Sequence, residues 1–470
     1  MLAYPTLAHR SHLGKTNCAI SSTAGSFGPV ALRSTKHFVD VGPNVWSTFV
    51  NAPSGTPQPT SPGAISVDVL DESVQLLREL TRRNVRHSLD GTVPLADGIV
   101  RVPAKNYYDP IRWQLEMNRI FKRVPLVLGF SAELAEPNSH KATEALGVPV
   151  LLSRDGEGTL RSFVNVCSHR GAVIVPEGTG TGRRFSCPYH AWTYDTKGDL
   201  VGILDKANFG EIDMACHGLT ELPVFERAGI IFGGVTPGEC VDIDAFLHGY
   251  DTMLNHLGLN SCHFVGSQSV EGPNWKVAYD GYLDFYHLPI LHKDTFGPAY
   301  NNKTINDAWG PHQRNAQPDE RFAALADIPE ECWPMSKMTT GVWTIFPHVS
   351  IAGFEAGGRL FMISQLLPGS TPDTSITTQY FLAAFDPTED DLAVIAKQME
   401  FLLHVVRDED YYTGNRIQRA VKTGVKTEFL FGRNEGPCQR FHGWVDNLVA
   451  AETFDDTVAL FAASQEFHDE

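Results

Sequence analysis

The chain has 470 residues, of which 42% are hydrophobic and 20% are charged, so it is too apolar for a mainly disordered protein. The 38 basic residues face 55 acidic ones, and the net charge of −17 repels phosphate backbones, so nucleic acid is not an expected partner. We also expect no membrane span, because no apolar run is long enough to cross a bilayer, and the eight scattered cysteines indicate a reducing compartment.

The composition of residues 1–65 predicts an N-terminal extension outside the folded part of the chain. Residues 1–39 contain four basic and no acidic residues, with scattered serines, which is the bias of an organellar transit peptide. The alternative is an unstructured or wrongly started extension. Prolines interleaved with Ser, Thr and Gly over 52–64 predict a linker. We expect a cytoplasmic protein, with organellar targeting as the alternative.

The segment 66–123 predicts two helices. Leucine and valine recur at helical spacing from about Asp68 onward, with acidic residues in the first turn. The second helix is expected to open with Asp109 as its N-cap and Pro110 at its first position, where a missing backbone N–H costs nothing.

Two domains are predicted beyond this segment. Residues 124–238 consist of short apolar runs separated by turn signals, which favours a compact all-β domain. Residues 239–470 mix helical and strand patterns. Their expected elements are a helix over 244–257, strands over 341–351, 360–367 and 377–385, and a long closing helix from Leu392 towards Ile417.

A first group of candidate ligands lies within the β domain. Cys167 and His169 form a CxH pair, and Cys187 and His190 form a CxxH pair further along the chain. Thiolates and imidazoles at such short spacings on two loops can converge on one metal centre. Three interpretations remain open at this point: separate core residues, a structural zinc site, or an iron–sulfur cluster in which two His replace two Cys on one iron.

A second group follows in the next domain. If residues 278–287 are helical, Asp284 and His287 lie on one face, while Pro289 ends or bends the helix and redirects His292. Two His and a carboxylate with open positions left over can form the facial triad of a non-haem Fe(II) oxygenase. Alone, two spaced His would be weak evidence in a chain with 18 of them.

Together, the order CxHRG, CPYHxW and then the Asp284 to His292 stretch resembles the catalytic alpha subunits of Rieske non-haem iron oxygenases, also called aromatic-ring-hydroxylating oxygenases. The resemblance covers roughly residues 66–440. It implies an α+β fold, in which an all-β Rieske domain precedes a catalytic domain built from an antiparallel sheet and helices. It also implies a Rieske [2Fe-2S] cluster held by Cys167, His169, Cys187 and His190, and mononuclear iron held by His287, His292 and a third ligand.

The resemblance places the third iron ligand at an Asp eight residues before a Gln, which selects Asp410 ahead of Gln418. Periodicity agrees in part, because Asp410 continues the apolar row of the long helix. Asp408 falls on the opposite face, but Glu409 lies close enough that periodicity alone does not exclude it. The alternative to a metal ligand is that residues 408–410 form a solvated acidic run on a helix surface.

By the same resemblance, Asp284 is not an iron ligand but a bridge between His287 and His190 of a neighbouring subunit. The resemblance further implies a head-to-tail homotrimer, with a separate beta subunit as a possible addition. Asp280 stands where relatives often carry Asn or Glu, and we expect it to affect the site entrance.

The resemblance implies a terminal oxygenase that hydroxylates an aromatic or other apolar small molecule. Its alternatives are O- or N-demethylation and quaternary-amine oxidation, and more distantly a zinc-stabilised or purely electron-carrying protein. A reductase or ferredoxin must supply electrons from NAD(P)H, because the sequence has no dinucleotide fingerprint after a strand. The expected pocket walls are Phe285, Leu288, Trp343, Ile345, Phe346 and Phe361.

Overall fold

A computed structural model describes residues 67–297 and 300–469, with side chains from Glu72 onward. The expected N-terminal extension, residues 1–65, lies outside the described residues. Among the residues that are described, no helix is long and apolar enough to cross a membrane.

Both helices expected in the segment 66–123 are present. Helix α1 spans Val67–Asp90 and α2 spans Pro110–Glu116, continuing as the π-helical turn η2, Met117–Phe121. The start of α2 is as predicted, because the Asp109 side chain accepts a hydrogen bond from the backbone N–H of Ile111.

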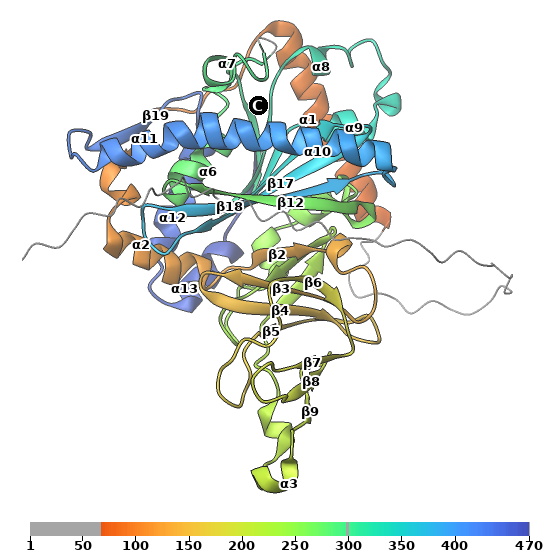
Figure 1. Cartoon of the computed structure of the whole chain (residues 1–470). Helices are drawn as coiled ribbons and strands as arrows, with labels where there is room; N and C mark the ends of the chain where they lie inside the picture. The colour runs from red at the N-terminus through yellow and green to blue at the C-terminus, as the bar shows by residue number, and fades with distance from the viewer. Residues whose placement is uncertain (1–66, 298–299, 470) are drawn as a thin grey trace, which may run out of the picture. The chain divides into compact units, whose positions relative to one another are not determined.

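Three small sheets form the β-rich part of the chain, which runs from orange through yellow to green in Figure 1. The first has the strand order β5-β4-β3-β6, the second β7-β8-β9 and the third β10-β11-β2. The bounds are β2 Leu126–Phe130, β3 Ser139–Ala145, β4 Val148–Arg154, β5 Leu160–Val164, β6 Gly178–Thr181, β7 Arg184–Ser186, β8 Thr193–Asp195, β9 Leu200–Gly202, β10 Val224–Arg227 and β11 Ile230–Gly233. The short helical segments α3 (Lys206–Phe209) and η4 (Met214–His217) lie between β9 and β10.

The second half of the chain is built on one antiparallel sheet of eight strands, in the order β12-β18-β17-β16-β15-β14-β13-β20. The bounds are β12 His263–Gly272, β13 Ile305–Trp309, β14 His312–Ala316, β15 Val342–Ile345, β16 Val349–Glu355, β17 Arg359–Pro368, β18 Ser375–Ala383 and β20 Glu466–His468. A β domain followed by an antiparallel sheet with helices confirms the predicted α+β class.

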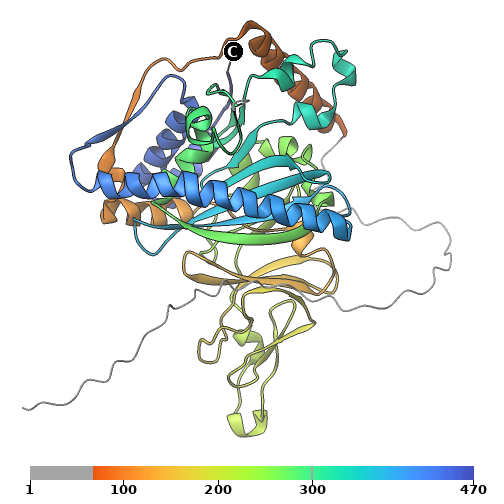
Figure 2. The same cartoon turned by 45° about the horizontal axis from the view of Figure 1, so that its top comes forward.

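The long closing helix is also present, and it runs across the sheet beside β12 in both views (Figures 1 and 2). It consists of α10 (Glu389–His404), the π-helical segment η7 (Val405–Asp410) and α11 (Tyr411–Val421). Thr388 caps its start through a hydrogen bond from the backbone N–H of Asp391 to the Thr388 hydroxyl.

The remaining elements surround the sheet. The helices are α4 Ile243–Leu247, α5 Tyr250–Asn255, α6 Trp275–Leu283, α7 Leu288–Leu291, α8 Glu320–Ala323, α9 Met335–Met338, α12 Gly436–Ala450 and α13 Phe454–Ala462, and the 3-10 turns are η1 Ala104–Tyr107, η3 Ser131–Glu133, η5 Leu259–Ser261 and η6 Glu330–Cys332. Strand β1, Val100–Pro103, pairs with the distant β19, Glu428–Phe431.

Three predicted elements are wrong in detail because the backbone turns inside them. The helix over 244–257 is broken between α4 and α5, where His248 and Gly249 adopt left-handed conformations with φ of 50° and 79°. The strand over 341–351 is the hairpin of β15 and β16, which turns at Pro347. The helix over 278–287 ends at Leu283, as α6.

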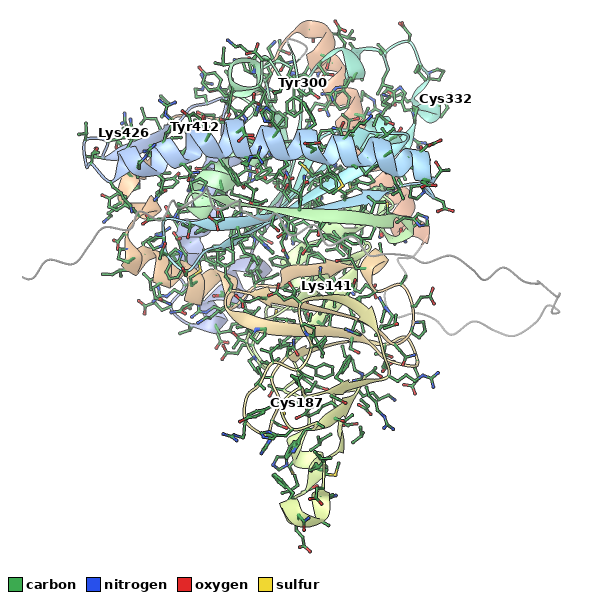
Figure 3. All side chains as sticks on the ribbon, in the orientation of Figure 1. Lys141, Cys187, Tyr300, Cys332, Tyr412 and Lys426 are labelled. Atoms are coloured by element: carbon green, nitrogen blue, oxygen red, sulfur yellow. The ribbon has the colours of Figure 1, made fainter. Side chains whose placement is uncertain are left out.

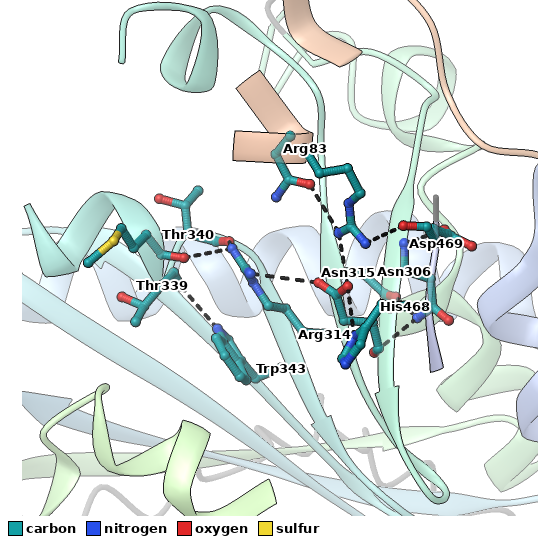
Figure 4. A network of polar contacts seen from close by, with 12 residues as sticks. Arg83, Asn306, Arg314, Asn315, Thr339, Thr340, Trp343, His468 and Asp469 are labelled. Atoms are coloured by element: carbon teal, nitrogen blue, oxygen red, sulfur yellow. Dashed lines mark hydrogen bonds and ion pairs between the residues drawn. The ribbon is translucent and has the colours of Figure 1, made fainter. Parts of the chain in front are cut away.

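A buried polar network joins α1 to the far edge of the sheet (Figure 4). Asp307 is fully buried and lies 2.9 Å from Arg83 and 3.7 Å from Arg314. The pKa of Asp307 is lowered, because the buried carboxylate is surrounded by these guanidinium groups and by His468, which outweighs its desolvation. The network therefore fixes β13, β14 and β20 to α1.

Candidate functional site: two metal centres and a pocket

The two loops that carry the first ligand group have the same backbone pattern. The N–H of Cys167 donates to the carbonyl of Ala172 at 2.8 Å, and the N–H of Gly171 donates back to Cys167 at 2.9 Å. In the second loop Cys187 makes the matching pair of bonds, with Trp192 at 2.8 Å and Ala191 at 3.0 Å. Each pair of bonds closes a tight turn behind its cysteine.

Both turns need a left-handed residue at the same place. Gly171 supplies it in the first loop, with φ of 76°, whereas Ala191 supplies it in the second, with φ of 54°. A glycine in the sequence therefore marks the first turn, but no glycine marks the second. The left-handed conformation is unfavourable for alanine, so the surrounding structure must stabilise the second loop in it.

The loops bring the four candidate cluster ligands together. Cys167 and Cys187 are buried at 3% and 4% exposure, and the imidazole rings of His169 and His190 lie 4.7 Å apart between centroids. The Nδ1 atom of His190 is buried and has no hydrogen-bond partner among the described residues. An orphaned imidazole nitrogen is expensive to bury, so this atom is available to bind metal.

The arrangement argues against the zinc alternative. A tetrahedral zinc site would hold its four ligand atoms about 3.3–3.8 Å apart. Among the described residues, His287, His292 and Asp410 have ligand atoms that all lie within 4.8 Å of one another. The four cluster candidates do not form such a compact group. Two cysteines and two histidines spread over a larger volume fit a two-iron cluster.

A tyrosine that the sequence analysis missed lies against the cluster ligands. The Tyr194 hydroxyl is 3.3 Å from the Cys167 sulfur and 3.0 Å from the backbone nitrogen of Ser168. Burial raises the pKa of Tyr194 to about 12, so its hydroxyl stays protonated and can donate to a thiolate. Its place in β8, two residues after the CPYHxW motif, gives no sequence signal for this contact.

The second group forms a compact triad. The Nε2 atoms of His287 and His292 lie 3.2 Å apart, and Asp410 Oδ1 lies 3.6 Å from the first and 3.1 Å from the second. Three ligands at neighbouring corners of an octahedral ion, each about 2.1 Å from the metal, would be spaced about 3 Å apart. The structure therefore brings together the three residues that the sequence predicted as iron ligands.

The two histidines come from the loop after α6 and from the end of α7. Pro289 does not end a helix here but occupies the first turn of α7. Asp284 is the C-cap of α6 in an extended conformation, so the predicted common helix face of Asp284 and His287 is wrong. Their contact forms across the loop instead, with Asp284 Oδ2 3.2 Å from His287 Nδ1.

The three carboxylates of the acidic run 408–410 make different contacts. Asp408 is exposed and pairs with Arg407, as expected for a solvated face. Glu409 is not placed as an iron ligand: its Oε2 accepts a hydrogen bond from His292 Nδ1 at 2.7 Å and another from the Thr295 hydroxyl at 2.9 Å. It can therefore fix the orientation and tautomer of His292.

The π-helical turn η7 explains how two consecutive acids reach one histidine. In an α-helix, neighbouring residues point about 100° apart, so Glu409 and Asp410 would diverge. The wider turn of η7 directs both towards His292, and π turns of this kind are frequent at functional sites. An α-helical period cannot show this from the sequence. Gln418, one helix further on, donates to the Tyr107 carbonyl at 3.0 Å and anchors α11.

A pocket of about 440 Å³ opens onto the triad. Among the predicted wall residues, Phe285 and Leu288 line it, but Trp343, Ile345, Phe346 and Phe361 do not; these four are buried in the core of the sheet at 0–1% exposure. Further lining residues are Phe296, Tyr300, Thr339, Phe354 and Arg359. Figure 3 labels Tyr300, which follows His292 in the chain, and Cys187 in the β-rich part.

Asp280 does not line this pocket, contrary to expectation. Asp280 belongs to α6, and its side chain accepts a hydrogen bond from the Tyr107 hydroxyl and contacts His442 Nε2, both at 2.9 Å. The residue therefore holds α6 against η1 and α12 and does not shape the entrance.

Comparison with known proteins agrees with this geometry. Residues 124–220 match the Rieske [2Fe-2S] domain, and residues 259–451 match the catalytic domain of the ring hydroxylating alpha subunit. A choline monooxygenase from Beta vulgaris, named as chloroplastic, is 31% identical over 379 residues, or 78% of this chain and 81% of that protein. The anthranilate 1,2-dioxygenase large subunit of Acinetobacter baylyi is 27% identical over 221 residues; the match spans 46% of this chain and 47% of that subunit, about half its length.

Solved structures show the same fold. Naphthalene 1,2-dioxygenase from Rhodococcus sp. superposes with a TM-score of 0.63 at 20% identity, covering 80% of this chain and 99% of that one. A quaternary ammonium Rieske monooxygenase superposes with a TM-score of 0.62 at 20% identity, covering 74% and 94%. The chain therefore belongs to the family of Rieske oxygenase alpha subunits, whose cofactors are a Rieske [2Fe-2S] cluster and mononuclear non-haem iron.

Proposed function

We propose that this chain is the terminal oxygenase component of a multi-protein system and that it oxygenates a small molecule bound in the 440 Å³ pocket. The proposal rests on the triad of His287, His292 and Asp410, whose ligand atoms lie 3.1–3.6 Å apart at the pocket wall. When bound, the cluster supplies single electrons and the mononuclear iron supplies dioxygen activation.

The residues around the triad hold its ligands and exclude water from the pocket. His292 is fixed by Glu409, and its ring edge packs against Phe296, with centroids 5.3 Å apart. Phe285 and Leu288 add apolar surface beside the two histidines. This wall favours an apolar substrate carbon near the triad, which supports hydroxylation of an aromatic or other apolar molecule. Demethylation and quaternary-amine oxidation use the same ligands and remain the alternative.

Electrons are proposed to pass from the cluster of one subunit to the triad of its neighbour through Asp284. The carboxylate contacts His287 Nδ1 with its Oδ2 atom and accepts from the backbone N–H of Tyr286 at 2.5 Å with its Oδ1 atom. It is 22% exposed, so a histidine of another chain could reach it.

Exposed apolar side chains lie beside both ends of this route. Tyr189, which precedes the cluster ligand His190, is 58% exposed, and Phe209 is 44% exposed. On the catalytic side, Tyr286 is 54% and Ile290 is 76% exposed. Such side chains support burial in a heterologous interface of the kind that closes a ring, and thus the predicted homotrimer.

The electron donor is proposed to be a separate reductase or ferredoxin that oxidises NAD(P)H, and a separate beta subunit is an open alternative. The cellular location stays a prediction: the cytoplasm, or an organelle addressed by residues 1–65. The Beta vulgaris relative is named as chloroplastic, which favours the second possibility.

The proposed function is tested by a single turnover. Protein whose cluster has been reduced chemically is mixed with dioxygen and one member of a panel of aromatic acids, methoxyarenes and quaternary amines. The proposal predicts cluster reoxidation together with an oxygenated product for at least one compound. His287→Ala, which lacks one triad ligand, should keep its cluster and form none. Product from His287→Ala at the wild-type yield would refute the site.

A further inference from the structure

One wall of the pocket carries a positive charge that has no ion-pair partner. Arg359 begins β17 and lines the pocket. It lies directly opposite Glu355 across the β16–β17 pairing, but the Glu355 side chain is exposed and makes no ion pair with it. Among the described residues, Arg359 is in no salt bridge, although it is only partly exposed.

The guanidinium group of Arg359 is nevertheless held in place. Its Nη2 atom donates to the Thr339 hydroxyl at 3.1 Å, and the group lies over the Phe361 ring, 4.7 Å from its centroid. A guanidinium has five N–H donors, and the others find no acceptor in the described part of the chain. Burial lowers the pKa of Arg359, as expected for a cation whose desolvation is not fully compensated.

The wall that presents Thr339 is rigid. The Thr339 side chain donates to the Met335 carbonyl at 2.9 Å, and the Thr339 carbonyl accepts from Trp343 Nε1 at 3.0 Å. Arg314 holds the flanking carbonyls, donating to Met338 at 2.7 Å and to Thr340 at 3.0 Å (Figure 4). Arg314 is itself fully buried beside Asp307, so the network that fixes the sheet edge also fixes this wall of the pocket.

The other two cations that line the pocket differ from Arg359. Arg321 is 44% exposed, pairs with Asp319 at 2.5 Å and stacks on Tyr300. Lys337 is exposed to solvent. Arg359 is thus the pocket cation that is partly buried and makes no direct ion pair in the described part of the chain, since the exposed Glu355, which also lines the pocket, acts on it only at longer range. Its fork of N–H groups matches a carboxylate.

We propose that Arg359 binds a carboxylate of the substrate and that the pocket accepts a small organic acid with an apolar body. This proposal rests on the proposed function and names its substrate class. The carboxylate would pair with Arg359 while the apolar part lies against Phe285 and Phe296 near the triad. A cation without an acid group would be repelled by Arg359 and could form no ion pair with it.

The test measures binding by calorimetry with two matched pairs of probes on the metal-loaded protein. Benzoate is compared with benzyl alcohol, and glycine betaine with choline; each pair differs mainly in a carboxylate replaced by a hydroxymethyl group. We expect at least one acid to bind more than about tenfold tighter than its alcohol. The pair that shows this preference distinguishes an aromatic acid from a trimethylammonium acid.

Arg359→Gln should weaken binding of that acid about 10- to 100-fold and leave the affinity for the alcohol within about twofold. Arg359→Lys should recover part of the loss, because it restores the charge but not the fork. The matched control is Arg86→Gln, which removes an exposed charge on α1, outside the pocket lining, and should change nothing. Iron and sulfide contents equal to wild type establish that each variant is folded.

Alcohols that bind the wild type as tightly as the acids, failure of both acids to bind, or full acid affinity in Arg359→Gln would each overturn the proposal. These outcomes are separable from failure of the proposed function. An acid preference that depends on Arg359 in a protein without oxygenase turnover would refute the oxygenase. Turnover of an alcohol probe with an unchanged KM in Arg359→Gln would refute the acid site alone.

Discussion

The cluster loops and the iron triad are built in opposite ways. The four candidate cluster ligands lie within a stretch of 24 residues, on two loops that repeat the same pair of backbone hydrogen bonds. The triad instead joins a loop after α6 to a π turn in the long helix, with 117 residues between His292 and Asp410. Local backbone geometry shapes the first site, whereas tertiary packing shapes the second. Damage to the first should therefore stay local, and the second should be sensitive to neighbours that bind no metal.

The largest expected effect is on the cluster. Cys187→Ala removes one of four ligands, so the red-brown colour and the acid-labile sulfide should be lost and turnover should fall to background. The mononuclear iron should remain, because its ligands lie in another domain. Visible absorption and sulfide analysis measure this, and a full sulfide content in the variant would contradict the assignment.

A smaller effect is expected where the two sites are proposed to meet. Asp284→Asn should keep both metal centres, because Asp284 ligates neither, yet slow turnover on the order of 10- to 100-fold, since a neutral amide holds an imidazole less firmly. Single-turnover reoxidation of the reduced cluster gives the rate. Asp294→Asn, an exposed acid ten residues along, is the matched control. Wild-type rates in Asp284→Asn would eliminate the bridge.

The sensitivity of the triad to its neighbours is tested at the acidic run. Glu409→Gln should weaken mononuclear iron binding by about tenfold or more, because the carboxylate that accepts from His292 Nδ1 is replaced. Asp408→Asn, which changes an exposed acid, should leave iron affinity at the wild-type value. Chelator titration of the iron measures both. Equal affinities in the two variants would show that Glu409 does not orient His292.

The smallest effect concerns tuning of the cluster. Tyr194→Phe removes the hydroxyl 3.3 Å from the Cys167 sulfur, and a hydrogen bond to sulfur stabilises the reduced cluster. The reduction potential should fall by tens of millivolts, on the order of 40 mV for a bond worth about 1 kcal/mol in a one-electron couple. Protein voltammetry gives the value, and an unchanged or higher potential would show that the hydroxyl does not donate to the sulfur.

The contrast between the sites also explains what the sequence could predict. Cys167, His169, Cys187 and His190 were identified because their spacing is itself the site. His287 and His292 were candidate ligands from their own stretch of sequence, whereas Asp410 was selected only through the resemblance, since helical periodicity alone left Glu409 open. The assignment of these residues as ligands stays a prediction, although the structure brings them together as expected.

Other features depend on long-range packing that no local pattern encodes. The pairing of β1 with β19 and of β13 with β20 joins distant segments, and the π turn at η7 departs from the α-helical period that the sequence analysis assumed. The expected pocket walls failed for a similar reason. Trp343 and Phe361 are apolar strand residues, but strand alternation does not say which face of a sheet meets the core and which meets the pocket.

If one chain holds two separate iron centres, both should be counted by metal analysis of the purified protein. We predict about three iron atoms and about two acid-labile sulfides per chain in the wild type. His287→Ala should contain about two iron atoms with the sulfide unchanged, and its visible spectrum should match the wild type. A His287→Ala protein that keeps the wild-type iron content, or a wild type that contains zinc and no sulfide, would exclude two separate iron centres of this kind.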